Sequence, residues 1–126
     1  MAVQAYFEKE RRVDNGRLSV AVGSGEEQFL PYDFLYAGLA SCFYYTLISL
    51  AEKMQLSWEF VEIEVDGKKR AEKIATLEWV KMDIKVKGLE GEQEKFLRAS
   101  DLAGKYCSIH ETISQVADIE QEVTFL

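Results

Sequence analysis

An 18-residue stretch without a charged side chain, residues 34–51, constrains the fold of this chain more than any other feature. A stretch of that length is long enough to cross a membrane as a helix. No cluster of Lys or Arg lies beside it, and hydroxyl groups are spread along it, on Tyr36, Ser41, Tyr44, Tyr45, Thr46 and Ser49. Because Pro31 and Asp33 are typical of a helix start, we instead predict a core helix from Pro31 to about Met54, buried on nearly all sides.

The length and the charge of the chain limit what it can bind. Its 126 residues predict a single domain over residues 1–126. The net charge of −7 disfavours nucleic acid and anionic membranes as partners. A chain of this size buries only about two thirds of the surface that it exposes when unfolded, so a dimer would be a natural way to bury more. The sequence shows no secretory signal, and we expect a cytoplasmic protein.

Alternating and apolar-rich segments predict strands on both sides of the long helix. Before it, Asn15-Gly16 separates two apolar runs, residues 3–10 and 18–22, which is the pattern of a β-hairpin. There is room for one further brief strand before Pro31. After the helix, antiparallel strands with one solvent-exposed face are predicted at residues 58–65 and 77–87, and a final strand at residues 122–125.

Two more helices are predicted between the last two strands. Apolar residues recur at helical spacing over residues 92–105, and Gly104 is a plausible stop signal. Ser108 and Glu111 fit a capping box for a short helix that begins at Ile109. The resulting order of elements predicts an α+β domain with an antiparallel sheet and two main helices.

The only two cysteines, Cys42 and Cys107, are the candidate reactive groups. In a reducing compartment such residues are most often buried apolar side chains. Cys42 is predicted roughly 13 Å from the start of its helix, where the helix dipole has little effect, so a reactive thiolate there would need a nearby Arg or Lys. Small residues around Cys42 would let a second helix carrying Cys107 approach it, but sequence alone does not establish a disulfide distance.

No metal or cofactor motif is present in the sequence. It lacks C-x-x-C, H-E-x-x-H, G-x-G-x-x-G and P-loop patterns, and it contains one histidine. Cys107 and His110 are three positions apart but have no other ligand cluster near them in the sequence, so we predict no metal site. We assign His110 a capping or solvent-facing position rather than a catalytic role.

Two segments of the chain resemble the motifs of the OsmC/Ohr family. Residues 31–43, PYDFLYAGLASCF, are similar to the P-x-[DE]-L-x-x-A-x-x-[AG]-C stretch of that family. Residues 105–113, KYCSIHETI, resemble its second cysteine motif, C-P/S-[VI]-x-x-T-[LI]. The order of elements, the spacing of the motifs and the final strand also match, so the resemblance covers nearly the whole chain.

The resemblance implies an intertwined homodimer with a site at the subunit interface. It also implies a thiol-dependent peroxidase that reduces organic or hydrogen peroxides. Cys42 would be the peroxidatic residue, which forms a sulfenic acid, and Cys107 would resolve it as a Cys42–Cys107 disulfide. An external dithiol would reduce the disulfide.

The chain departs from the peroxidase pattern at one site position. Family members that reduce organic hydroperoxides carry a Glu directly after the proline, where it orients an Arg over the peroxidatic sulfur, and this chain has Tyr32 there. Asp33 is the candidate substitute, although it lies about 100° further around the helix. For the Arg we favour Arg11 or Arg12 over Arg17, which falls in the Asn-Gly turn.

Rival functions remain open at this stage. The chain could be a non-catalytic member that binds a small apolar ligand, or a redox sensor that uses the same sulfurs without turnover. The missing Glu favours such a member, whereas cysteines in both motif positions favour the enzyme. Aromatic residues could line an apolar pocket in either case, and the candidates are Tyr6, Phe7, Phe34, Phe43 and Tyr44.

Overall fold

The computed structural model describes residues 2–126, which form two compact units. The first comprises residues 2–36 and the second residues 37–126. The long helix α1 (Pro31–Met54) begins in the first unit and continues through the second. The single domain expected from chain length stays a prediction.

The first unit is a four-stranded sheet in the order β1-β2-β3-β4. Its strands are β1 (Gln4–Phe7), β2 (Arg11–Asp14), β3 (Ser19–Val22) and β4 (Gln28–Phe29). The Asn-Gly turn joins β2 to β3, and the Asn15 side chain accepts hydrogen bonds from the Arg17 and Leu18 amides. The brief strand expected before Pro31 is confirmed as β4, which pairs parallel to β3.

The predicted first strand, residues 3–10, is wrong in extent. It ends at Phe7, and a turn at residues 8–10 starts a second hairpin between β1 and β2. The turn residues Glu8, Lys9 and Glu10 are all charged and exposed, so they have no apolar face that would extend a strand. Arg11–Asp14, and not residues 3–10, is therefore the partner of β3.

Helix α1 has the predicted ends, but the extent of its burial differs from the prediction. Its start is fixed by Asp33, whose carboxylate accepts the Leu30 amide at 2.7 Å while its own amide donates to the Leu30 carbonyl at 3.0 Å. A single line of α1 side chains is buried, at Leu39, Phe43, Leu47 and Ala51. Residues four apart lie on the same face of a helix, so α1 is buried on one face only. The expectation that α1 is buried on nearly all sides is therefore wrong for one chain.

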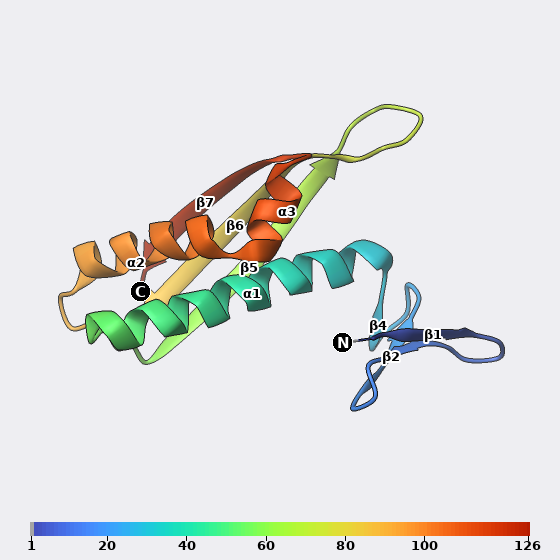
Figure 1. The fold of residues 1–126 in the computed structure, drawn as a ribbon, viewed down its shortest axis with the longest axis horizontal. Helices are drawn as coiled ribbons and strands as arrows, with labels where there is room; N and C mark the ends of the chain where they lie inside the picture. Colours follow the sequence, from blue (N-terminus) through green and yellow to red (C-terminus); the bar gives the residue numbers. More distant parts are fainter. Residues whose placement is uncertain (1) are drawn as a thin grey trace. The chain divides into compact units, whose positions relative to one another are not determined.

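By length and composition α1 would also be able to cross a membrane. A helix that packs one face into a protein core passes the same test. In the second unit α1 lies along the sheet beside the two later helices (Figure 1).

The second unit is a three-stranded sheet with its helices on one face (Figure 1). Its strands are β5 (Phe60–Lys69), β6 (Leu77–Lys87) and β7 (Asp118–Phe125). β5 is antiparallel to β6 as predicted, but β7 pairs parallel to β6. The α+β class is confirmed, with a mixed sheet in place of an antiparallel one. The segment between β6 and β7 crosses back over one face of the sheet, which a parallel pairing requires.

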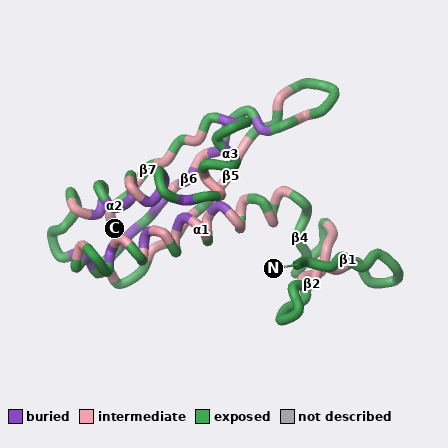
Figure 2. The backbone as a smooth tube through the Cα atoms, viewed as in Figure 1, coloured by how far each residue is buried: buried purple, intermediate pink, exposed green. Residues whose placement is uncertain are grey.

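Alternation along the three strands separates an apolar face from a charged one. On β6 the buried face carries Val80, Met82, Ile84 and Val86. The opposite face carries charged side chains, and Lys81 there pairs with Glu122 of β7 at 3.2 Å. In Figure 2 the buried positions follow β6 and the helix faces turned toward it.

The crossover consists of α2 (Gln93–Tyr106) and α3 (Ser108–Ser114), separated by Cys107 alone. Gly104 does not stop α2. It is a buried residue within the helix, where a Cβ atom would lie 2.6 Å from Oε1 of Gln121 on β7. The amide of Gln121 donates to the carbonyl of Ser100 at 2.9 Å and to its hydroxyl at 3.1 Å. The glycine therefore allows a close polar contact between α2 and the sheet.

The predicted capping box at Ser108 is also wrong. Cys107 is the N-cap of α3, and its sulfur accepts the His110 amide at 3.4 Å. Ser108 is instead the first residue of the helix, so its hydroxyl does not cap it. The N-cap lies one residue earlier than predicted, because the Cys107 thiol takes the place of the Ser108 hydroxyl as the capping group.

Replacing the two helical glycines should change stability in opposite directions. Gly104→Ala should lower the free energy of unfolding by roughly 1–2 kcal/mol, because displaced Gln121 leaves the buried Ser100 hydroxyl unsatisfied. Gly38→Ala in α1 should raise it by roughly 0.5–1 kcal/mol, since the nearest atom to its new Cβ is Cδ1 of Ile109 at 3.6 Å. Urea unfolding of both variants measures the difference, and a Gly104→Ala protein as stable as Gly38→Ala would contradict this packing.

Candidate active site

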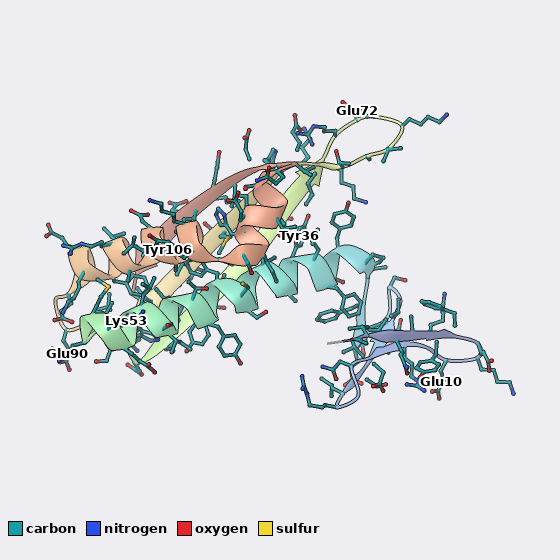
Figure 3. All side chains as sticks on the ribbon, viewed as in Figure 1. Glu10, Tyr36, Lys53, Glu72, Glu90 and Tyr106 are labelled. Atoms are coloured by element: carbon teal, nitrogen blue, oxygen red, sulfur yellow. The ribbon has the colours of Figure 1, made fainter. Side chains whose placement is uncertain are left out.

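The second unit brings both cysteines to the contact between α1 and the α2–α3 junction. Cys42 is half-buried on α1, Cys107 is fully buried at the junction, and both are free thiols. The Cys42 sulfur lies 4.0 Å from the hydroxyl oxygen of Ser108, the residue after Cys107. In Figure 3 the labelled Tyr106 marks the end of α2, immediately before this junction.

The close approach of α1 and α3 follows from a small residue on α1. Gly38 lies one turn before Cys42, and a Cβ atom there would be in ordinary contact with the Ile109 side chain. The prediction that small residues around Cys42 admit the segment carrying Cys107 is consistent with this contact.

Hydrogen-bond donors from the junction lower the pKa of the Cys42 thiol below its ordinary value. Burial alone would raise it. The Cys107 thiol, the Ile109 amide, and the hydroxyl and amide of Ser108 together outweigh burial. We expected that only a guanidinium could do this, because the dipole of α1 is too remote. The structure supplies neutral donors instead, so a cation is not the sole means of activation.

Cys107 is perturbed in the opposite direction. Burial, followed by its hydrogen bond and charge interaction with Cys42, raises the pKa of Cys107 to about 11. The His110 amide opposes this change only in part. At neutral pH, Cys107 is therefore a protonated thiol, and the pKa values of the two thiols are shifted in opposite directions.

The His110 side chain lies beside α2. Its imidazole is near Gly104, with Nε2 3.5 Å from the position that a Cβ would take there. Burial lowers the pKa of His110, while the nearby Glu111 carboxylate acts in the opposite sense. Within residues 2–126, no group of three or more His, Cys, Asp or Glu side chains is placed to hold a metal ion.

The two favoured arginines differ in the first unit. Arg12 stacks 4.2 Å from the centre of the Tyr6 ring, pairs with Asp14 at 3.3 Å and donates to the Ser19 hydroxyl at 3.0 Å. Arg11 is exposed, and its guanidinium has no such contact within residues 2–126. Adjacent residues of a strand point to opposite faces of the sheet. The Arg12 side chain is therefore held by its neighbours in the sheet, whereas the Arg11 side chain on the other face is not.

Asp33 acts in the described structure as a helix cap. Its carboxylate is bound to the Leu30 amide, and among the described residues it forms no ion pair with Arg11 or Arg12. Its predicted role in orienting an arginine stays a prediction. Arg17 lies in the Asn-Gly turn, as expected.

The aromatic candidates are divided between the two units. Phe43 is fully buried in the core and Tyr44 is half-buried beside it on α1. In the first unit, Phe7 is exposed, whereas Phe34 lines a cavity of about 200 Å³ together with four apolar side chains and two polar ones, Val3, Val13, Leu18, Val20, Asp14 and Asn15.

Comparison with known proteins identifies the family. Residues 23–122 match the family model described as OsmC-like protein. The chain belongs to the OsmC-like family. The resemblance of the two cysteine segments is thus confirmed at the level of the family, whereas a search of curated proteins found no match.

Solved structures of this fold cover almost the entire chain. An OsmC-like protein from Mycoplasma pneumoniae is 18% identical, with a TM-score of 0.86 over 99% of this chain and 96% of its own. An organic hydroperoxide resistance protein OsmC from Legionella pneumophila is 19% identical, with a TM-score of 0.77 over 98% and 95%. The organic hydroperoxide resistance protein OhrB of Bacillus subtilis is also 19% identical, with a TM-score of 0.74 over 98% and 96%. At these identities the likeness shows the fold.

Sequence reasoning missed the donors that surround Cys42. Ser108 was assigned to a helix cap, and the amide of Ile109 carries no side-chain signal. The one available clue was the position of Ser108 directly after Cys107, inside the second motif.

Alkylation should distinguish the two thiols of the OsmC-like chain. Iodoacetamide reacts with thiolates, so Cys42 should react at least tenfold faster than Cys107 near neutral pH, and the pH midpoint of its rate should be lower in the folded protein than in denaturant. Peptide mass spectrometry over time measures both rates. In denaturant they should converge, and equal rates in the folded protein would contradict the described asymmetry.

Proposed function

We propose that this OsmC-like protein is a thiol-dependent peroxidase that reduces organic or hydrogen peroxides. The observation that carries the proposal is the pairing of Cys42, whose pKa is lowered, with the buried and protonated Cys107. A peroxidatic sulfur must be a thiolate, and a resolving sulfur must lie close to it. Two neighbours of the fold named as organic hydroperoxide resistance proteins support this choice of substrate.

The first step oxidises Cys42. Its thiolate attacks one oxygen of the hydroperoxide, the O–O bond breaks, and the alkoxide leaves and takes a proton to become an alcohol. Cys42 is then a sulfenic acid, with the two electrons of the sulfur transferred to the peroxide.

The second step uses Cys107. Its sulfur attacks the Cys42 sulfenic sulfur, its proton is lost, and the hydroxyl group of the sulfenic acid leaves as water. The product is a Cys42–Cys107 disulfide, which protects Cys42 from further oxidation. An external dithiol then reduces the disulfide and is itself oxidised to a disulfide. The proposed location is the cytoplasm, where such reductants are present.

We further propose that the chain works as a homodimer. Outside its single buried line, the charge-free part of α1 is half-buried or exposed in one chain, and Tyr45 is 73% exposed. A second copy packed on this helix would cover apolar surface that a monomer leaves in water.

A non-catalytic role is the alternative, and two observations favour it. Tyr32 stands where hydroperoxide-reducing members carry a Glu, so that part of the expected arginine network is missing. The apolar cavity beside Phe34 would suit a small apolar ligand. The same thiol pair would also serve a redox sensor.

Peroxide treatment tests the enzyme directly. Organic hydroperoxide should consume two thiols per chain and produce one intrachain Cys42–Cys107 disulfide, detected by mass spectrometry after alkylation. Cys107→Ser should stop at the Cys42 sulfenic acid and then over-oxidise, and Cys42→Ser should not react. Two thiols that remain alkylatable after excess peroxide would reject the peroxidase and favour the ligand-binding protein.

Substitution of the arginines tests whether a cation assists Cys42. Because Arg12 is committed to Asp14 and Tyr6, we expect Arg11 to be the assisting group. Arg11→Ala should slow peroxide reduction at neutral pH by about tenfold for each unit by which the Cys42 pKa rises. Arg12→Ala and Arg17→Ala are the matched controls in the same hairpin. Unchanged rates in all three variants would leave activation to the neutral donors alone.

A further inference from the structure

We propose that the Ser108 hydroxyl donates a hydrogen bond to the Cys42 thiolate and is a catalytic residue of the peroxidase reaction. The inference deepens the proposed function and rests on it. Its geometric basis is the 4.0 Å contact between Ser108 Oγ and Cys42 Sγ, which crosses from α3 to α1. A contact of this length is at the outer limit for a hydrogen bond to sulfur, and catalytic hydrogen bonds often shorten when the reacting complex forms.

The Ser108 side chain is free for this task. Its hydroxyl has no other hydrogen-bond partner within residues 2–126, whereas its carbonyl accepts the Thr112 hydroxyl at 2.9 Å. The capping position of α3 belongs to Cys107, so the hydroxyl is not needed to begin the helix. The contact with Cys42 is thus its one described polar interaction.

A hydroxyl suits this position chemically. It does not ionise near neutral pH, so it can donate to the thiolate at any pH where Cys42 is ionised. A donor that binds the charged form more strongly than the neutral form favours ionisation. Ser108 would therefore increase the fraction of Cys42 that is ready to attack a peroxide.

Few charged groups surround the contact between Ser108 and Cys42, so loss of the Ser108 hydroxyl should change the ionisation of Cys42 measurably. Of the titratable side chains on the crossover, the Cys107 thiol acts on the pKa of Cys42. Helix α1 has no charged residue between Asp33 and Glu52. The helix-facing positions of β6 and β7 carry no ionisable side chain, and on β5 Lys69, at the end of the strand, pairs with the buried Leu77. In the second unit, neutral donors therefore account for much of the polarity near Cys42.

The test follows alkylation of Cys42 across pH in the full chain with Cys107 retained. Ser108→Ala removes one hydrogen bond to Cys42. It should raise the pH midpoint of Cys42 alkylation by about 0.5–1 pH unit and slow alkylation at neutral pH roughly three- to tenfold. Ser108→Gly, which also lacks the hydroxyl, should behave alike, and Ser108→Thr should restore the wild-type midpoint. Ser114→Ala is the matched control, because Ser114 lies on the same helix and donates only to the Glu111 carbonyl.

Thermal unfolding separates this role from a structural one, since Ser108 is exposed and its variants should melt close to the wild type. A wild-type midpoint in both Ser108→Ala and Ser108→Gly would overturn the proposal, as would a Ser108→Thr protein that resembles Ser108→Ala. The assay contains no peroxide, so it is independent of turnover. A shifted midpoint in a protein that fails to reduce peroxide would support the Ser108 contact while rejecting the peroxidase.

Discussion

The parallel pairing of β7 with β6 determines where the second cysteine lies. Parallel neighbours need a connection that returns across the sheet, and here α2 and α3 provide it on the face that α1 also occupies. The break between these two helices is the single residue Cys107. A hairpin from β6 to an antiparallel β7 would have no crossover, and Cys107 would not be carried over the sheet to α1.

The crossover also explains why two chemically identical side chains differ in their readiness to ionise. Cys107 is fully buried at the junction of α2 and α3, where a negative charge is costly. Cys42 lies on the more open side of the contact and receives donors from the start of α3. One packing arrangement therefore suppresses ionisation of the inner sulfur and promotes ionisation of the outer one.

Local patterns in the sequence predicted most of the fold and only part of the site. Pro31 and Asp33 predicted the start of α1, and the alternation along β6 predicted that strand to the residue. Alternation carries no information about strand direction, so the parallel β7 was missed, although two helices between consecutive strands were a signal for it. Gly104 and Ser108 were misassigned because both resemble local helix signals, while their contacts are with Gln121 and Cys42, which are distant in the chain. For the arginine that would assist Cys42, the sequence left two candidates, Arg11 and Arg12. It does not show which face of a short strand provides partners for a side chain.

The contact between α2 and β7 limits how this part of the chain can evolve. Gln121 interrupts an otherwise apolar strand face, and it is held by Ser100 across a gap that only a glycine at position 104 leaves open. An apolar residue in place of Gln121 would leave the Ser100 hydroxyl without its hydrogen-bond donor, and a larger residue in place of Gly104 would displace the Gln121 side-chain amide. Substitutions at these three positions are therefore coupled. A change at one of them alone would weaken the packing of α2, the helix that ends directly before Cys107.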